Sequence, residues 1–376
     1  MKTTVLCVLW AVLPVACTRQ LPIVDDFEEP ARAAGPMAGA PSAKPATQMP
    51  VAPVQCTSSV RPELLRAAQA GFGLGPFAIM NGELVFVETS QAPGNVTSTI
   101  RKLSAAGEEQ MLAGLDQQVV ATDILVGLDS LYLMMQDSRG VRGLHRLPKT
   151  GGMPQLVVVF PGRASPRLTA VDANYAYAWE GPARSWRVAL RDGALTELPF
   201  SYDADPRVVM HEGDLWFRVN SGNQARPAGT YRIDLDAEPL AETLMGTRGC
   251  SNSWAPTSRG LLCASGSRIY LAELSPNKQT DSVLFYGAPQ DDPDRGVQMS
   301  RLDGDVVYVY PYLNRKALPQ AIRSVNIQNA TEQMLACDRH DTLWLEFDAD
   351  HVYWLEKRHE AGGEQAGIFR APKRPR

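Results

Sequence analysis

The sequence predicts an all-β protein: a single β-propeller of about seven four-stranded blades, with six as the alternative, closed by an N-terminal strand. Three observations predict this fold. The 376 residues include 30 Gly and 28 Pro and no long amphipathic stretch, which favours short strands joined by turns. A self-similar unit recurs seven times from Phe77 onward, at a spacing near 45 residues. Most copies contain four strand-like segments, as one propeller blade does.

The second segment of each copy gives the clearest repeat, because a polar turn precedes a run of β-branched, aromatic or aliphatic residues. The anchor positions of these segments are Leu84, Leu131, Ala176, Leu215, Leu261, Val306 and Val352. A third and usually a fourth strand-like segment follow each anchor. A blade has two apolar faces and is not stable alone, so neighbouring blades are expected to stack around an axis.

Ring closure is predicted to involve the N-terminal side of the repeats. The seventh copy has three strand-like segments, and the segment at residues 51–56 is predicted to supply its fourth strand. Residues 61–69 read as a short helix, with Ser59 as its cap and Pro62 in its first turn. We expect this helix to pack on the outside of the ring, with partner binding as the alternative.

Residues 1–16 are predicted to form a lipoprotein signal peptide. Lys2 precedes an apolar run at residues 5–15, which is shorter than the roughly 20 residues of a membrane span. Residues 17–50 are rich in Ala, Pro and Gly and are predicted to form a flexible tether. Residues 51–376 are assigned to the propeller domain.

The end of the leader resembles a lipobox, the bacterial motif in which a small residue precedes a cysteine that is then lipidated. The residues concerned are Leu13-Pro14-Val15-Ala16-Cys17. The resemblance implies lipidation of Cys17. The alternative is ordinary cleavage near Ala16, with Cys17 left as a free thiol. By the same analogy, Thr18 in place of Asp after the cysteine favours the outer membrane.

Cysteine usage is consistent with an exported protein. Four cysteines follow Cys17, and they allow three pairings. Cys250 and Cys263 flank one predicted hairpin and are expected to pair. Cys56 and Cys337 are expected to bridge the closing strand and the sixth blade, which would staple the ring. The alternative is a set of buried, unpaired thiols.

No linear motif predicts a catalytic residue, a metal ligand or a cofactor site. The five histidines are scattered, and the pair His359-Glu360 reads as a solvated loop. Acidic residues recur in the turn before the second segment, and we interpret them as turn formers. They are Asp129, Asp172, Asp214, Asp303, Asp305, Asp348 and Asp350. The acidic loop at residues 291–295 is interpreted as solvated surface.

Aromatic residues fall in the second segments, where they are expected to fill the wedge between blades, with a carbohydrate platform as the alternative. They are Tyr132, Tyr177, Trp216, Tyr308, Tyr353 and Trp354.

Three stretches resemble a bacterial family of secreted or lipid-anchored repeat propellers, which is distantly similar to propellers of the low-density-lipoprotein-receptor type. They begin at Val171, Phe347 and Leu144, and the receptor-type strand motif is approximated by Tyr353-Trp354-Leu355-Glu356. The resemblance covers residues 77–373. It implies a binding scaffold without assigned chemistry, and receptor-type propellers commonly have six blades.

The functional hypothesis is a non-catalytic cell-envelope lipoprotein with a monomeric body that binds a protein or a polysaccharide. Its membrane contact would be the N-terminal lipid. The alternative is an envelope hydrolase or lyase, of lactonase or glycan-cleaving type, with its site at the central channel. The formal net charge of −4 shows no basic excess, so no nucleic-acid partner is predicted.

Overall fold

The computed structural model describes residues 61–90, 96–161, 166–180, 184–198, 209–219, 227–237, 240–246, 250, 253–265, 268–272, 281–286, 296–312, 320–339, 342–356 and 366–373. All of them belong to one compact unit, Gln55–Arg376. The regular elements of this described part are strands, and it contains no helix long and apolar enough to cross a membrane.

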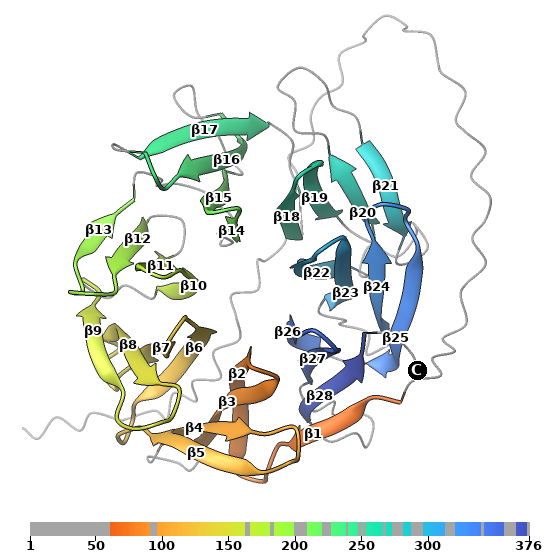
Figure 1. Cartoon of the computed structure of the whole chain (residues 1–376). Helices are drawn as coiled ribbons and strands as arrows, with labels where there is room; N and C mark the ends of the chain where they lie inside the picture. The colour runs from red at the N-terminus through yellow and green to blue at the C-terminus, as the bar shows by residue number, and fades with distance from the viewer. Residues whose placement is uncertain are drawn as a thin grey trace, which may run out of the picture. The chain divides into compact units, whose positions relative to one another are not determined.

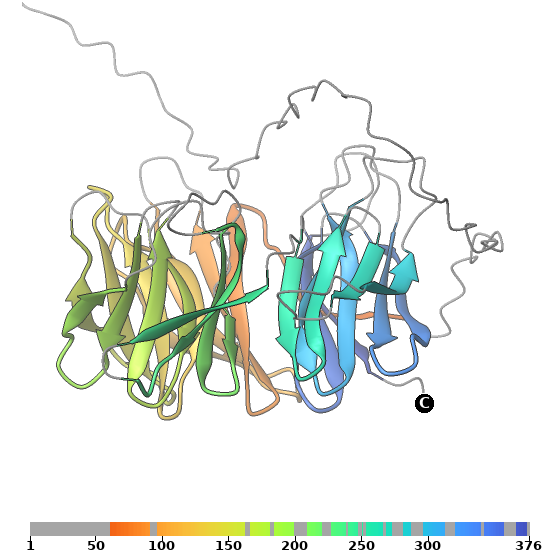
Figure 2. The same cartoon turned by 90° about the horizontal axis from the view of Figure 1, so that it is seen from above.

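The strands form seven antiparallel sheets of four strands each, which we call blades I to VII. Figure 1 shows the blades arranged in a ring, and Figure 2 shows their strands running along the ring axis. Blades I to VI each use four consecutive strands. Blade VII combines the last three strands with the first. Seven four-stranded blades and closure by an N-terminal strand are therefore confirmed, and the six-bladed alternative is wrong.

Blades I to III contain the strands β2 to β13. Blade I has β2 (Phe72–Met80), β3 (Glu83–Ser90), β4 (Ser98–Leu103) and β5 (Glu109–Gly114). Blade II has β6 (Val120–Val126), β7 (Ser130–Gln136), β8 (Arg142–Pro148) and β9 (Gln155–Val159). Blade III has β10 (Arg167–Val171), β11 (Tyr175–Glu180), β12 (Arg184–Ala189) and β13 (Leu195–Glu197).

Blades IV to VII contain the remaining strands. Blade IV has β14 (Val209–His211), β15 (Asp214–Val219), β16 (Gly229–Asp234) and β17 (Ala241–Gly246). Blade V has β18 (Ser253–Thr257), β19 (Gly260–Ser265), β20 (Arg268–Ala272) and β21 (Asp281–Tyr286). Blade VI has β22 (Gly296–Asp303), β23 (Val306–Tyr312), β24 (Gln320–Asn326) and β25 (Glu332–Arg339). Blade VII has β26 (Thr342–Phe347), β27 (His351–Glu356), β28 (Gly367–Pro372) and β1 (Glu63–Ala67).

The hairpin between the first two strands of blade I shows why turn residues mark the blades. Met80 pairs with Glu83, and the two residues between them, Asn81 and Gly82, have φ angles of 54° and 77°. Two successive positive φ angles give a turn whose twist matches that of the flanking strands, and Asn-Gly is the pair that best adopts it. The polar turn before each second segment therefore fixes where that strand begins.

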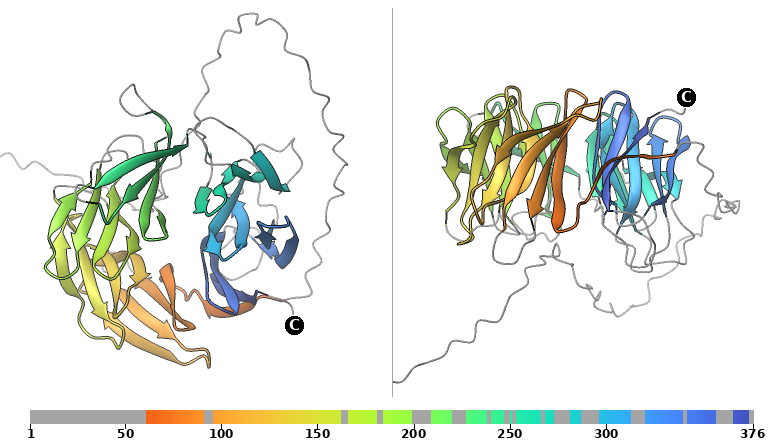
Figure 3. Two further views of the ribbon diagram at one scale, coloured as in Figure 1. Left: turned by 45° about the horizontal axis from the view of Figure 1, so that its top comes forward. Right: turned by 90° about the horizontal axis from the view of Figure 1, so that it is seen from below.

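The closing strand differs from the prediction. β1 pairs antiparallel with β28, from Glu63 opposite Arg370 to Ala67 opposite Gly367. The helix predicted at residues 61–69 is therefore wrong. The fourth strand of blade VII also comes from β1 and not from residues 51–56, which lie outside the described residues. The open edge of β28 offers backbone hydrogen bonds that outweigh the modest local helix propensity of this segment. In Figure 3, the orange-red β1 lies beside the blue strands of blade VII.

The core lies between neighbouring blades. At the closure, Phe77 and Phe86 of blade I share one buried cluster with Tyr353 and Ile368 of blade VII. The aromatic residues predicted to fill the wedges are all buried, which confirms that interpretation. They are Tyr132, Tyr177, Trp216, Tyr308, Tyr353 and Trp354.

Cys250 and Cys263 form a disulfide with a Cα–Cα distance of 5.2 Å, as predicted. Cys337 is also disulfide-bonded. Cys56, Cys17, the signal peptide and the tether lie outside the described residues too, so the Cys56–Cys337 pairing stays a prediction. The same is true of His359-Glu360 and of the loop at residues 291–295.

Candidate functional site

The turn between the first two strands of blade VII shows what its acidic residue does. Asp348 Oδ1 accepts hydrogen bonds from the backbone N–H groups of Asp350 and His351, both at 2.8 Å. Its Oδ2 accepts a 2.6 Å hydrogen bond from the hydroxyl of Tyr353. One carboxylate therefore shapes the turn and fixes an aromatic side chain of the next strand, which bears out the turn-forming interpretation of this aspartate.

Two other blades repeat the contact between the aspartate and a tyrosine five residues later. The Tyr177 hydroxyl donates to Asp172 Oδ2 at 2.9 Å, and the Tyr308 hydroxyl donates to Asp303 Oδ2 at 2.7 Å. Burial, together with the hydrogen bond to a carboxylate, raises the pKa of both tyrosines well above its usual range. We call this arrangement the Asp–Tyr lock.

Blade II has the tyrosine of the lock without the aspartate. Its hairpin pairs Val126 with Leu131, as the hairpin of blade III pairs Val171 with Ala176. The next residue in blade II is Gly127, whose position corresponds to Asp172. A Cβ atom on Gly127 would lie 2.5 Å from Cε2 of Tyr132, so this turn has no room for a side chain unless the ring moves.

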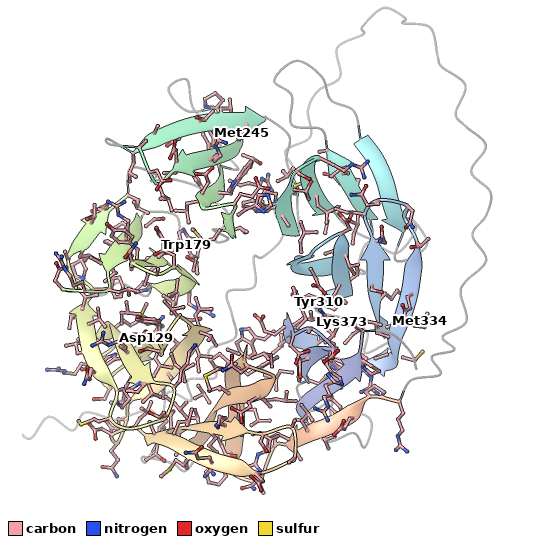
Figure 4. The ribbon with its side chains drawn as sticks, viewed as in Figure 1. Asp129, Trp179, Met245, Tyr310, Met334 and Lys373 are labelled. Carbon is pink, nitrogen blue, oxygen red and sulfur yellow. A yellow bond between two sulfur atoms is a disulfide. The ribbon has the colours of Figure 1, made fainter. Side chains whose placement is uncertain are left out.

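The unlocked Tyr132 lines a pocket of about 410 Å³ between blades II and III. No hydrogen bond to its hydroxyl forms within the described part of the chain. The lining comes from the first turns of blades II and III, from β7 and β8, and from the end of β12 and the turn that follows it. It comprises Leu128, Asp129, Tyr132, Arg146, Asp172, Ala173, Asn174, Tyr175, Ala189, Leu190, Arg191 and Asp192. Figure 4 labels Asp129 on this side of the ring.

Two charged side chains of the lining act on the Tyr132 phenol. Arg146 lies opposite Tyr132 in the pairing of β8 with β7, and its Nη2 donates to Gln155 Oε1 at 3.2 Å. Burial raises the pKa of Tyr132, the Asp129 carboxylate raises it further, and the Arg146 guanidinium partly offsets both effects. The phenol therefore stays protonated at neutral pH and can donate a hydrogen bond into the pocket.

Other carboxylates of the lining already have partners. Asp172 Oδ1 accepts from the backbone N–H groups of Asn174 and Tyr175, in addition to the lock through Oδ2. Asp192 accepts from Arg191 and from the backbone of Ala194. The polar groups of the lining whose side chains form no hydrogen bond in the described part are Asp129, Tyr132, Asn174 and Tyr175.

One exposed large apolar side chain belongs to the pocket. Leu128 is part of the lining and is 83% exposed. The other exposed large apolar side chains of the described residues are Leu64, Phe72, Met111, Met153, Leu156 and Val159, and none of them lines the pocket.

The histidines of the described part are dispersed. His145 is on β8, where burial lowers its pKa and its Nδ1 lies 3.2 Å from the Gly143 carbonyl oxygen. His211 contacts Trp216, with ring centres 6.1 Å apart, and His351 lies beside Tyr353. No three His, Cys, Asp or Glu side chains in the described ranges are grouped so that they could hold a metal ion.

Sequence reasoning named Asp129, Tyr132 and Asp172 but did not bring them together in one site. The aspartates were interpreted as turn formers and the tyrosines as wedge residues, and both interpretations hold where the lock is complete. The available signal was the spacing of five residues between Asp and Tyr in three blades. Gly127 before Tyr132 breaks that pattern.

Comparisons with known proteins address the fold. No protein-family model and no curated protein matches the chain. Among solved structures, an oligogalacturonate lyase in complex with manganese has a TM-score of 0.53 at 14% identity, covering 77% of this chain and 85% of that one. YCF48 from Cyanidioschyzon merolae has a TM-score of 0.50 at 10% identity, covering 84% of this chain and 98% of that one. The shared feature is the fold alone. This chain is a seven-bladed β-propeller.

Proposed function

We propose that the chain is a non-catalytic binding scaffold of the bacterial cell envelope. Its propeller binds a protein or a polysaccharide of the envelope at the pocket between blades II and III. The observation that carries the proposal is the unlocked Tyr132, whose hydroxyl lines a 410 Å³ pocket instead of meeting a turn carboxylate. Pockets of this size are typical of ligand sites.

The envelope part of the proposal rests on the sequence. The leader at residues 1–16 and the cysteine at position 17 support export and lipidation, and the Ala/Pro/Gly-rich residues 17–50 support a flexible tether. The disulfide between Cys250 and Cys263 is consistent with an oxidising compartment. In this arrangement, the lipid holds the protein at the outer membrane and the tether lets the propeller reach its partner.

A binding role also fits the way in which the pocket is built. Asp172 and Asp192 are fixed by backbone and side-chain hydrogen bonds, and Arg146 is held by Gln155. Such groups are pre-organised, so a ligand loses little affinity to the ordering of the site. The exposed Leu128 at the rim adds apolar area that a ligand can cover.

The test of the site uses the mature chain with Cys17→Ser, which removes the lipid attachment. Wild-type, Tyr132→Phe and Tyr353→Phe forms are immobilised and exposed to separated envelope protein and polysaccharide fractions. We expect Tyr132→Phe to retain clearly less material than the parent, because the pocket loses its free hydroxyl. Tyr353→Phe, which removes a locked hydroxyl in another blade, should retain as much as the parent.

The masses of the bound molecules before and after incubation test the non-catalytic part. Unchanged masses support a scaffold, whereas shortened chains would show an enzyme. Equal retention by Tyr132→Phe and the parent would reject the pocket as the site. A fractionation experiment tests the anchor. The chain with Cys17 intact should fractionate with the outer membrane, and the Cys17→Ser variant should be released from it. A chain that stays with the membrane after Cys17→Ser would contradict lipid anchoring.

A further inference from the structure

We infer that the pocket between blades II and III binds a neutral, hydroxyl-rich ligand, a short segment of a saccharide. This inference rests on the proposed function and names the ligand class for the same site. It follows from three properties of the lining: its mixture of donors and acceptors, its charge balance, and the tyrosine ring and aliphatic groups beside them.

Hydrogen-bonding groups of both kinds face the pocket. The Asp129 carboxylate only accepts, the Arg146 guanidinium only donates, and the Asn174 amide and the Tyr132 hydroxyl can do both. A hydroxyl group also donates and accepts, so a molecule with several hydroxyls can satisfy all four side chains. A ligand with donors only or acceptors only would leave some of them unpaired, which is costly in a partly buried site.

The charges of the lining are largely balanced. Three aspartates face two arginines, and Arg191 pairs with Asp192 at 3.1 Å. Asp172 already accepts three hydrogen bonds, so its charge is dispersed within its own turn. Asp129 and Arg146 remain, and their opposite charges both act on the Tyr132 phenol. Asp129 would repel an anionic ligand, and Arg146 would repel a cationic one. A neutral ligand therefore fits best.

The lining also offers apolar surface. Tyr175 lines the pocket, and the Arg187 guanidinium lies 4.6 Å from the centre of its ring, which stiffens the ring. Leu128 and Ala173 add aliphatic surface. A sugar ring has hydroxyl groups at its edge and C–H groups on its faces, and therefore matches a polar pocket that also contains an aromatic ring and aliphatic groups.

Blades II, III, VI and VII all have a tyrosine at the same position of the repeat. Among these four blades, blade II alone leaves the tyrosine hydroxyl without a turn carboxylate. In blades III, VI and VII, the equivalent tyrosine hydroxyl is taken up by the turn aspartate. In blade II, Gly127 leaves the hydroxyl of Tyr132 available to a ligand. The substitution Gly127→Asp would supply the missing carboxylate, and because its Cβ atom displaces the Tyr132 ring, it should remove the hydroxyl from its present position in the pocket.

The experiment measures binding of four defined probes to the mature chain with Cys17→Ser by saturation-transfer NMR and titration. Cellobiose and chitobiose are neutral, digalacturonate is anionic and the glucosamine dimer is cationic. We expect at least one neutral disaccharide to bind at millimolar concentration and the charged dimers to bind more weakly. Tyr132→Phe should lower the affinity by about three- to tenfold, the effect of one lost hydrogen bond.

Two further variants keep the test decisive. Tyr308→Phe removes a locked hydroxyl in blade VI and should leave the affinity unchanged. Gly127→Asp forces the Tyr132 ring to move and should abolish binding, and circular dichroism shows whether the variant folds. If it fails to fold, Tyr132→Phe with the Tyr308→Phe control still decides the question.

The outcomes separate this inference from the proposed function. Preferred binding of a charged dimer, or no binding of either neutral disaccharide, overturns the saccharide inference. In that case the proposed function still stands if Tyr132→Phe reduces capture of envelope material. If Tyr132→Phe changes neither capture nor disaccharide binding, both proposals fail at this site.

Discussion

Arg66 of the closing strand contacts Glu88 of blade I, with Nη2 2.7 Å from Oε1, although the two residues belong to different sheets. Glu88 is 2% exposed, and its other oxygen lies 3.1 Å from Arg101 Nε. Glu109 contacts both arginines, at 3.2 and 2.9 Å. The four side chains form an ionic network that links the last blade to the first, in addition to the backbone pairing of β1 with β28.

Removing the charge of Arg66 should destabilise the contact between blades VII and I. Arg66→Met keeps an unbranched side chain and leaves the buried Glu88 with Arg101 alone, so we expect a loss of about 3 kcal/mol in the free energy of unfolding. Urea unfolding at neutral pH measures it. Arg139→Met is the control, because Arg139 is 81% exposed and its pair with Asp137 should contribute much less to stability. Equal losses in the two variants would contradict a special role for the closure network.

The closing strand also shows where sequence reasoning reaches its limit. The strand repeats were predictable because each blade carries its own turn and its own alternation. The segment containing Glu63, Leu64, Leu65, Arg66 and Ala67 has residues that favour a helix, and its strand conformation comes from the edge of β28, roughly 300 positions later in the chain. Local propensity cannot report a pairing at that separation.

Protonation of Asp348 should make the protein less stable in acid. Partial burial opposes ionisation of Asp348, but hydrogen bonds from Tyr353 and from the N–H groups of His351 and Asp350 outweigh it, so its pKa lies below its usual range. A carboxyl group with a lowered pKa in the folded state contributes stability above the unfolded-state pKa of about 3.9, and loses it as the pH falls through the folded-state value.

Asp348→Asn tests this. Its deficit relative to the parent should be present at pH 7, at about 1 kcal/mol, and should shrink as the pH falls from about 5 toward 3. Unfolding in urea at a series of pH values gives the difference. Asp350→Asn alters an exposed carboxylate of the same turn and should show neither effect. A deficit that does not change with pH would mean that the charge of Asp348 is not what stabilises the lock.

Asp123 should have the opposite pH dependence. It lies on β6, it is 7% exposed, and its Oδ1 accepts a 2.7 Å hydrogen bond from Arg167 of blade III. Burial raises the pKa of this carboxyl, and Arg167 offsets only part of the increase. A raised pKa means that the folded state holds the proton more tightly, so the contribution of Asp123 to stability falls as the pH rises from about 4 through the folded-state pKa.

In Asp123→Asn, this fall should be absent, because the amide does not titrate. The stability of the variant relative to the parent should therefore increase as the pH rises from about 4 to 7. The amide oxygen can still accept from Arg167, and only the long 3.5 Å contact of the Leu168 N–H with the second oxygen is lost, so the fold should be retained. If the relative stability decreases over the same range, Arg167 has a larger effect than burial on the pKa of the Asp123 carboxyl.

The candidate site could have been predicted only in part. Tyr132 and Asp129 are visible in the repeat, and the Asp–Tyr spacing of blades III, VI and VII marks Gly127 as an exception. The pocket itself also needs Tyr175 and Asp192 of the next blade. Their distance from Tyr132 depends on how the two blades stack, and a strand pattern does not contain that information.

The disulfide of blade V gives the last prediction. Cys250 and Cys263 are 13 positions apart, and a crosslink that closes a loop of about this length stabilises a protein by about 3 kcal/mol in the chain-entropy description. The double variant Cys250→Ala, Cys263→Ala should therefore unfold at a lower urea concentration than the parent. Cys263 is fully buried in a cluster with Trp254 and Leu271, so part of the loss will come from packing. Reduction removes the crosslink and keeps both sulfur atoms, but it also breaks the disulfide of Cys337. The parent and the double variant are therefore both unfolded with and without a reductant, and the difference between the two shifts isolates the Cys250–Cys263 crosslink from packing. If reduction changes the midpoint in neither the parent nor the double variant, crosslinking contributes nothing measurable, and the predicted Cys56–Cys337 bond cannot strengthen the ring either.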